Sequence, residues 1–180
     1  MRYLILSDIH SNLEALEKCL RLAKGKYDQA VCLGDLVGYG PDPNPVIDHI
    51  REVANVIVRG NHDKACCGIT EAEDFNIWAR LATLWTRSEL TPEHVAFLRG
   101  LSQGPVTVDG FVFVHGSVAD EDEYIMGAAD AVPALKAQTT RAIYFGHTHI
   151  QGGFMVSPEG RYQSIDCKSV WSRSSPGRST

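Results

Sequence analysis

Short apolar runs alternate with segments of helical periodicity along the first third of the chain. The runs 3–7, 29–33 and 54–58 are short and apolar, which predicts buried strands. Between them, apolar residues recur three and four positions apart over 13–23 and 46–50, which predicts two amphipathic helices. This β-α-β-α-β order implies a parallel sheet with right-handed crossovers.

Capping residues mark the ends of these two helices. Residues 11–14 read Ser-Asn-Leu-Glu, a capping box that predicts a helix start at Ser11, and Gly25 predicts the end of that helix. Asn44 followed by Pro45 predicts the start of the second helix, because Asn caps helices and Pro suits their first turn.

The second half of the chain mixes helices with antiparallel strands. The stretch 73–99 has a helical pattern that Thr91 and Pro92 interrupt, which predicts two helices with Thr91 as the cap of the second. Runs 105–108 and 111–114 flank an Asp-Gly pair, which predicts a hairpin with a type I′ turn. The remaining predicted elements are a helix over 130–137 and strands over 142–145, 154–156 and 162–165. Parallel and antiparallel strands together predict a mixed-sheet, layered α/β protein.

Composition and charge limit the organisation and the partners. The 180 residues are 44% hydrophobic and 22% charged, which predicts one domain, over residues 1–171, with a loose polar tail over 172–180. The apolar start is too short for a signal peptide or a membrane span, and no two cysteines form a C-x-x-C pair, which predicts a cytoplasmic protein with no membrane partner. The net charge of −5 argues against a nucleic-acid polymer as partner, and a homo-oligomer is left open.

Metal-binding types of side chain follow five of the predicted strands. Strand ends of an α/β sheet converge on one rim, where ligands bind. The five blocks are Asp8-Ile9-His10, Gly34-Asp35, Gly60-Asn61-His62-Asp63, His115-Gly116-Ser117 and Gly146-His147-Thr148-His149. This nitrogen and oxygen ligand set suits Mn, Fe or Zn and is too large for one ion. Two ions about 3.5–4 Å apart form the usual clamp for phosphoester displacement, and Asp35 is central enough in the order to bridge them.

The ordered set D-x-H, G-D, G-N-H-D, H-G and G-H-x-H resembles the calcineurin-like metallophosphoesterases from Met1 to about Ile150. The residues around the first two blocks are similar to a small bacterial branch of predicted phosphodiesterases. The resemblance implies a four-layer α/β/β/α sandwich with mixed β-sheets. It also implies hydrolysis of a phosphoester, above all a small phosphodiester, by a hydroxide held between two divalent ions, with Mn favoured among Mn, Fe, Zn, Ni and Co.

Roles of single residues follow from the same resemblance, position by position. Both metal sites share one ligand, Asp35. The implied ligands are Asp8, His10, Asp35 and His149 for one ion, and Asp35, Asn61, His115 and His147 for the other. His62 matches the family's non-ligand histidine, which binds the phosphoryl group or protonates the leaving oxygen, so His62 and Asp35 are the predicted catalytic residues. Asn61 and His62 are predicted to bind substrate, with Arg59 and Asn12 as further candidates; Arg59 equally fits a salt bridge and Asn12 a helix start.

Alternative functions remain open at this point. Protein serine/threonine phosphatases read G-D-x-x-D-R-G in the second block, whereas Gly38 and Tyr39 stand here in place of the last Asp and the Arg. This difference weakens the alternative of a phosphomonoesterase or protein phosphatase, and Asp42 becomes a candidate to orient His62. A metal-bearing scaffold without catalytic activity is the alternative from another class.

A helical insert over 73–100 carries four large apolar residues, which fit either the core face of a helix or a cap over the site that sets substrate size. These residues are Trp78, Leu81, Leu84 and Trp85. His49 and His94 lie outside the five blocks and are predicted to be solvated. The acidic turn 121–123 is predicted to be solvated as well.

Overall fold

Helices and three small sheets make up the part of the chain that the structure describes, which confirms the predicted mixed α/β class. The computed structural model describes residues 1–137, 140, 142–157 and 159–166. The predicted loose tail over 172–180 therefore lies outside the described residues. Among the described helices, each is too short or too polar to cross a membrane.

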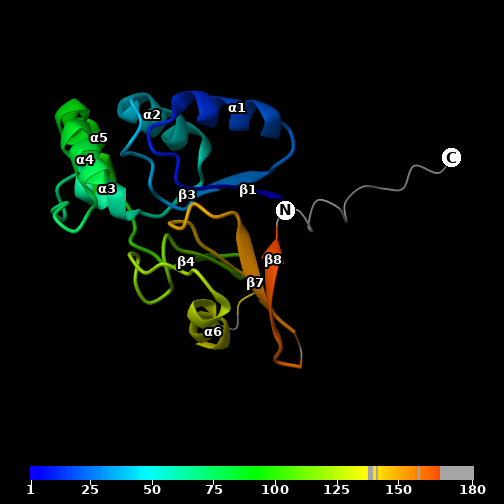
Figure 1. Ribbon diagram of the computed structural model, residues 1–180. Helices are drawn as coiled ribbons and strands as arrows, with labels where there is room; N and C mark the ends of the chain where they lie inside the picture. The colour runs from blue at the N-terminus through cyan, green and yellow to red at the C-terminus, as the bar shows by residue number, and fades with distance from the viewer. Residues whose placement is uncertain (138–139, 141, 158, 167–180) are drawn as a thin grey trace.

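The first sheet is parallel and carries two helices on one face. Its strands are β1 (Tyr3–Leu6), β2 (Gln29–Cys32) and β3 (Val56–Ile57), hydrogen-bonded in that order. The helices α1 (Leu13–Ala23) and α2 (Pro43–Val53) connect these strands and lie together above the sheet in Figure 1. The β-α-β-α-β prediction is confirmed.

The second sheet contains both strand directions. β4 (Val106–Val108) runs antiparallel to β5 (Phe111–Phe113), which runs parallel to β6 (Ala142–Tyr144). Asp109 and Gly110 have φ angles of +51° and +78°, as a type I′ turn requires, so the predicted hairpin is confirmed.

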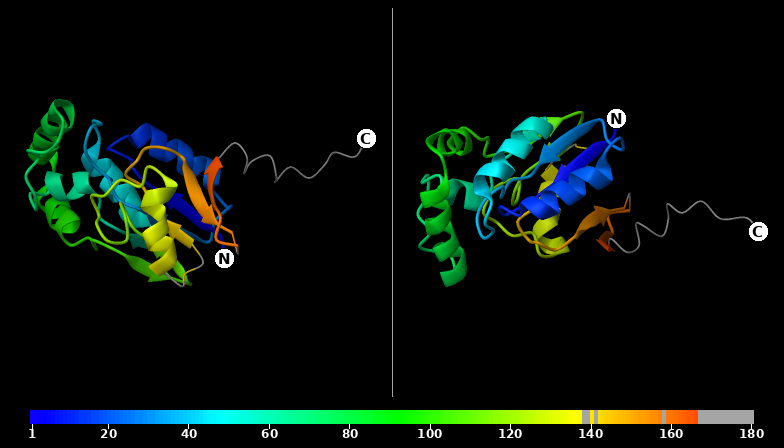
Figure 2. Two further views of the ribbon diagram at one scale, coloured as in Figure 1. Left: turned by 60° about the horizontal axis from the view of Figure 1, so that its bottom comes forward. Right: turned by 90° about the horizontal axis from the view of Figure 1, so that it is seen from above.

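The last elements are α6 (Ala128–Ala137) and a separate hairpin of β7 (Gly152–Val156) and β8 (Tyr162–Asp166). In Figure 1, α6 lies on the far side of the molecule from α1 and α2, and Figure 2 shows the same elements from two other directions. The predicted strands 154–156 and 162–165 lie within this hairpin. The four-layer detail of the fold stays a prediction.

Three helices gather at one end of the molecule (Figure 1): α3 (Asn61–Cys66), α4 (Ile77–Glu89) and α5 (Pro92–Arg99). Thr91 caps α5 as predicted, since its Oγ1 accepts the backbone N–H three residues later at 3.2 Å. The other helix of the predicted pair begins at 77 rather than 73, because the Asn76 side chain accepts two backbone N–H groups of the first turn at 3.0 Å. Sequence reasoning missed α3 altogether.

Two predicted helix starts are wrong by one or two residues. Asn12, not Ser11, caps α1, accepting the Ala15 N–H at 3.0 Å. Ser11 instead joins the sheet edge through a backbone bond to Leu36. Asn44 lies inside α2 and bonds the backbone of Glu89 and Thr91 in the α4–α5 connection. Both asparagines stabilise a helix end, and Asn44 does so between elements that are far apart in sequence.

Two apolar clusters form the core. One lies between the first sheet and its helices and extends to α5. The other lies where the two sheets face each other and contains Val31, Leu33 and Val58 from the first sheet side and Phe113 from the second. Burial on both faces explains why these strands are continuous apolar runs rather than alternating ones.

The core-face prediction for the helical insert is wrong. Trp78, Leu81, Leu84 and Trp85 are all exposed, and Trp78 is 74% exposed. The buried residues of α4 are instead small, namely Ala79, Thr83 and Thr86. Small side chains let α4 approach α3 closely, which leaves the large apolar face outside.

His94 also contradicts the prediction of a solvated side chain. It is buried, with its Nδ1 2.7 Å from Asn44 Oδ1 and its Nε2 2.9 Å from Asp48 Oδ1. Both ring nitrogens are therefore used to hold α5 against α2. His49 is half-buried, with Nδ1 2.9 Å from the Pro45 carbonyl.

Candidate metal centre

The five polar blocks meet at one edge of the molecule, because each follows the carboxyl end of a strand. Backbone bonds join neighbouring blocks: the Asp8 N–H donates to Gly34 O at 3.1 Å and the His10 N–H donates to Asp35 O at 3.0 Å. The His147 N–H donates to both carboxylate oxygens of Asp8, at 3.0 and 3.1 Å. Backbone N–H groups, which donate to carbonyl oxygens and to the Asp8 carboxylate, therefore hold these blocks together.

Asp35 lies at the centre of the site and is 1% exposed. Its Oδ2 is 3.7 Å from His10 Nε2 on one side and 3.4 Å from His115 Nε2 on the other. Its Oδ1 accepts the backbone N–H of His62 at 2.9 Å. Oδ2 thus faces two groups of candidate ligands, while a backbone hydrogen bond fixes Oδ1.

The first group around Asp35 contains Asp8, His10 and His149, whose ligand atoms and that of Asp35 all lie within 4.8 Å of one another. The Nε2 atoms of His10 and His149 are 2.9 Å apart, and Asp8 Oδ1 is 3.5 Å from His149 Nε2. Two ring nitrogens and two carboxylates that point at one another suit a shared cation, since a nitrogen lone pair and a carboxylate both donate electrons to a metal.

The second group contains Asp35, His115 and His147, also within 4.8 Å of one another. Asn61 joins it, because its Oδ1 is 3.1 Å from His115 Nε2. The ligand sets implied by sequence resemblance are therefore brought together in full, with Asp35 common to both. Such nitrogen and oxygen sets fit two divalent first-row ions.

Backbone carbonyls orient the histidine rings. His10 Nδ1 lies 3.1 Å from Val37 O, and His115 Nδ1 lies 2.8 Å from Leu33 O. His147 makes the same kind of contact through Nε2, 3.1 Å from Asp122 O. Since a carbonyl only accepts, each of these nitrogens carries the proton, and the opposite nitrogen of each ring is free to bind a metal.

The ligands adopt a backbone conformation that L-residues rarely use. Five of them have φ angles between +50° and +68°, in the left-handed region. They are Asp8, His10, Asp35, His147 and His149. Each such residue costs on the order of 1 kcal/mol or more, a cost that recurs at functional sites.

Glycines make the close approach of the blocks possible. A Cβ on Gly34 would lie 2.5 Å from Gly60 N, and a Cβ on Gly60 would overlap Asp35. A Cβ on Gly146 would overlap Ser7. Only glycine fits at these three positions without moving a ligand.

The charge states of Asp35 and His115 depend on each other. Burial opposes ionisation of Asp35, but His115, with His62 and His10, outweighs burial and holds the pKa of Asp35 well below its usual range. Burial likewise opposes the charged form of His115, yet Asp35 raises the pKa of His115 to about 9. A metal ion bound here would compete with that proton for the ring nitrogen and displace it.

His62 lies beside the two groups of candidate metal ligands and belongs to neither of them. Its ring contacts those of Tyr39 and Phe75, with a centroid distance of 4.7 Å to each. Its Nδ1 is buried without a hydrogen-bond partner, and a Cβ on Gly38 would lie 2.6 Å from that atom. The interpretation that Asp42 orients His62 is therefore wrong; aromatic packing positions the ring. Burial lowers the pKa of His62 to about 4, so the ring is neutral at pH 7.

The two further substrate-binding candidates have structural partners. Arg59 donates to the Glu121 carboxylate at 2.8 Å, and Asn12 caps α1. Glu121 is 7% exposed and also accepts from Lys64 at 3.1 Å, so the solvated-turn prediction is wrong for this residue. The turn is folded inward because two cations from the β3–α3 segment meet its carboxylate.

Replacing Glu121 should destabilise the protein. Glu121→Ala leaves Arg59 without its buried counter-ion and Lys64 with Asp122 alone, so we expect the free energy of unfolding to fall by about 3 kcal/mol. Urea unfolding measures the change. Glu123→Ala, on the exposed neighbour in the same turn, should change the free energy by less than about 0.5 kcal/mol. Equal effects of the two substitutions would rule out a stabilising role for the ion cluster.

Asp63 is the main residue that sequence reasoning left without a role. Its Oδ1 accepts the backbone N–H groups of Leu36 and Val37 at 2.8 and 3.2 Å, and its Oδ2 accepts that of Gly60 at 3.0 Å. It thereby joins the loop that carries Asp35 to the start of α3. Burial, with the nearby Asp35, raises the pKa of Asp63 to about 7. In the sequence, the position of Asp63 in the Gly-Asn-His-Asp block was the feature that pointed to a role at this site.

A cavity of about 530 Å³ opens beside the metal ligands. Asn61, His62 and His147 line it on the metal side, and Phe75 and Tyr124 add aromatic walls. The Tyr124 ring stacks on His147 with centroids 3.7 Å apart. Because Asn76, the N-cap of α4, and Ala79 within α4 belong to its lining, the helical insert borders the site, as one of the two interpretations expects.

Known proteins are similar to this chain in sequence. An uncharacterized protein of Methanocaldococcus jannaschii is 33% identical over 163 residues, which are 87% of this chain and 65% of that protein. Serine/threonine-protein phosphatase 1 of Salmonella typhimurium is 31% identical over 94 residues, 51% of this chain and 43% of that protein. The chain thus spans about two thirds or less of these relatives.

Solved structures are also similar to this chain. A metallophosphoesterase from Sphaerobacter thermophilus is 38% identical with a TM-score of 0.75, covering 89% of this chain and 65% of that one. A putative diadenosine tetraphosphatase, 18% identical with a TM-score of 0.58 over 91% of this chain and 92% of that one, shares the fold. The profile of the calcineurin-like phosphoesterase superfamily domain matches residues 1–165. The chain therefore belongs to the calcineurin-like phosphoesterase superfamily.

Proposed function

We propose that this protein hydrolyses a small phosphodiester at a centre of two divalent metal ions. The observation that carries the proposal is the position of Asp35, whose one oxygen faces His10 and His115 at 3.7 and 3.4 Å. A carboxylate shared by two ligand groups is what a pair of adjacent ions requires. Manganese is our favoured metal among the first-row divalent ions that oxygen and imidazole ligands without thiolate accept.

The residues have separable roles in this proposal. Asp8, His10 and His149 with Asp35 hold one ion, and Asn61, His115 and His147 with Asp35 hold the other. When bound, divalent ions neutralise phosphate charge and lower the pKa of water. His62 stands at the edge of the cavity, where it hydrogen-bonds a phosphoryl oxygen or the leaving oxygen.

Charges in the cavity favour a diester over a monoester. A monoester dianion needs more cationic groups than a diester monoanion does. Among the described residues that line the cavity, the Lys or Arg side chain is Lys64, which is already bonded to Glu121 and Asp122. Glu71 and Asp74 line the same cavity and repel a second negative charge. Tyr39 adds an uncharged ring at this wall.

Replacing His62 should impair turnover without removing metal. We expect His62→Asn to lower kcat about 100-fold, the contribution of a positioned proton donor or acceptor, while the metal content per chain is unchanged. The steady-state rate on a chromogenic diester and metal analysis by mass spectrometry measure the two quantities. His49→Asn, on α2, is the matched control and should retain full kcat. If the variant lost metal in step with activity, His62 would be a ligand instead.

The proposed function is tested on purified protein stripped of metal with a chelator and then reloaded. Bis(p-nitrophenyl) phosphate and p-nitrophenyl phosphate are compared with and without Mn²⁺. We expect metal-dependent hydrolysis with the diester preferred. Preference for the monoester would favour a phosphatase, the first alternative. Stoichiometric metal with no turnover of either ester would leave a metal-bearing scaffold and disprove the proposal.

A further inference from the structure

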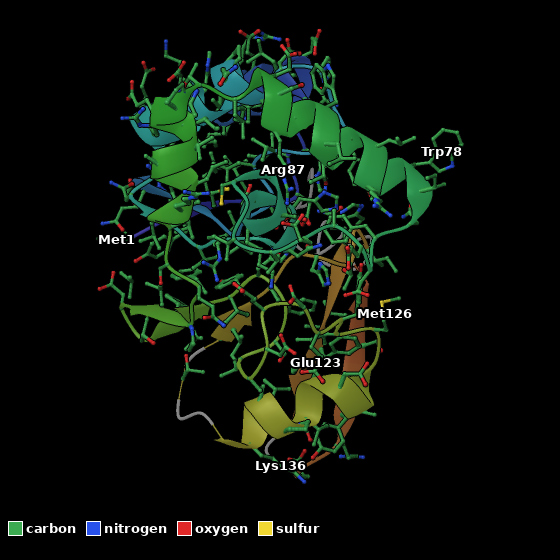
Figure 3. The ribbon with its side chains drawn as sticks, turned by 90° about the vertical axis from the view of Figure 1, so that its left-hand side faces the viewer. Met1, Trp78, Arg87, Glu123, Met126 and Lys136 are labelled. Atoms are coloured by element: carbon green, nitrogen blue, oxygen red, sulfur yellow. The ribbon has the colours of Figure 1, made fainter. Side chains whose placement is uncertain are left out.

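One helix presents five large apolar side chains to solvent. We call them the α4 stripe: Ile77, Trp78, Leu81, Leu84 and Trp85. Their exposed fractions run from 41% for Trp85 to 74% for Trp78. Figure 3 shows Trp78 pointing away from the rest of the molecule. Single exposed apolar residues are ordinary, but a contiguous set of this size marks an interaction surface.

The α4 stripe lies on a rigid element. Its members are spaced by one, three, three and one residues, which places them on one side of the helix. The opposite side is anchored, since Ala79, Thr83 and Thr86 are buried. Arg87 fixes the end of the helix by donating to Ala65 O at 2.8 Å. The helix therefore presents the stripe in a fixed orientation.

We propose that the α4 stripe is the contact surface between two copies of this chain, paired antiparallel about Leu81. The spacing of the stripe reads the same in both directions from Leu81. Antiparallel pairing therefore sets Leu81 against Leu81 of the second copy, Ile77 against Trp85, and Trp78 against Leu84. Each tryptophan meets a smaller aliphatic side chain, as interdigitating helices require. A two-fold interface needs this self-complementarity.

The area available suits a dimer. Each stripe residue exposes on the order of 100 Å² or more of apolar surface, with the tryptophans contributing most. Together they supply most of the roughly 800 Å² per partner that a stable interface buries. Trp and other aromatic residues also supply the largest share of binding energy at such interfaces.

Charge argues against a lipid surface as the occupant. Helices that lie on membranes carry several basic residues beside their apolar face. α4 carries two, Arg80 and Arg87, and Arg87 is paired with Glu71 at 3.0 Å. The whole chain has a net charge of −5, which anionic lipids repel. A second copy of the chain is the occupant that fits the symmetry of the stripe.

Sedimentation velocity over the micromolar concentration range tests this interface. The wild-type chain should sediment as a dimer at the higher concentrations. Leu81→Glu places two carboxylates face to face on the two-fold axis and should raise the dimer Kd at least about 100-fold. Leu81→Lys should do the same. Leu22→Glu is the matched control, because Leu22 is a similarly exposed helical leucine (58%) on α1, and should leave the dimer intact.

Mixing the two Leu81 variants gives the decisive result. Glu and Lys then meet across the axis, so the mixture should form heterodimers with a Kd within about 10-fold of the wild-type value. Circular dichroism of each variant excludes unfolding as the cause of dissociation. A wild-type chain that is monomeric at every concentration, or a Leu81→Glu dimer, would overturn the proposal. A monomer that co-sediments with phosphatidylcholine vesicles would assign the stripe to a membrane surface instead.

Discussion

Asp35→Asn should lower kcat/KM for a phosphodiester by at least about 1,000-fold, equivalent to about 4 kcal/mol of transition-state stabilisation. The substitution replaces the oxygen that faces both His10 and His115 with a neutral amide oxygen or an NH₂ group. Because both ligand groups share this residue, metal content should fall for both ions rather than for one. Steady-state kinetics and metal analysis by mass spectrometry give the two results.

Asp42→Asn provides the control for this experiment. Asp42 is the residue before α2 and makes no side-chain capping bond, so the loss of its charge should leave kcat/KM within about 2-fold of the original value. Asp8→Asn, in contrast, should weaken chiefly the ion that Asp8 and His149 hold. Retention of activity in Asp35→Asn would show that the two ligand groups do not act as one centre.

The second large effect is expected at Asp63. Asp63→Ala leaves three buried backbone N–H groups without an acceptor, those of Leu36, Val37 and Gly60. We expect the free energy of unfolding of the metal-free protein to fall by about 3 kcal/mol or more. Guanidinium unfolding in the presence of a chelator measures this change without a contribution from metal binding.

Asp63→Asn removes the negative charge but keeps one side-chain oxygen as a hydrogen-bond acceptor. Its amide oxygen still accepts from Leu36 and Val37, whereas its NH₂ group meets the N–H of Gly60. We therefore expect a smaller loss of stability than for Asp63→Ala. Metal affinity should fall in the same order, because the bonds of Asp63 join the loop of Asp35 to the helix that begins at Asn61. An unchanged unfolding midpoint in Asp63→Ala would contradict this role.

The gathering of the candidate ligands was predictable because the carboxyl ends of neighbouring strands converge, although these strands belong to two sheets, β1–β3 and β4–β6. Short apolar runs revealed β1, β2 and the later hairpins. The polar residues that follow these runs had to lie at the strand ends. The position of Asp35 between two histidine groups follows from this topology. The left-handed backbone of Asp8 and His10 has no pattern in the sequence, and the Gly-Asn-His-Asp block marks Asp63 without showing which groups it bonds, because both features depend on contacts between distant loops.

The errors also have physical causes. Helical periodicity shows that α4 has an apolar face, but not that this face is turned inward; the small residues Ala79 and Thr83 decided the packing. His94 and Glu121 looked solvated because polar side chains usually are, yet each is buried against polar partners on an element far away in sequence. Such partners are a property of the tertiary fold.

At this edge of the molecule, the left-handed backbone of five candidate ligands lowers stability, whereas their side chains are needed for the proposed activity. Glycine would relieve the conformational cost at any of these positions, but would remove the side chain on which metal binding depends. A search for thermostable variants that ignores activity should therefore collect glycine or asparagine substitutions at these residues and lose the metal centre. Backbone bonds such as Asp8 N–H to Gly34 O hold these loops in the strained conformation.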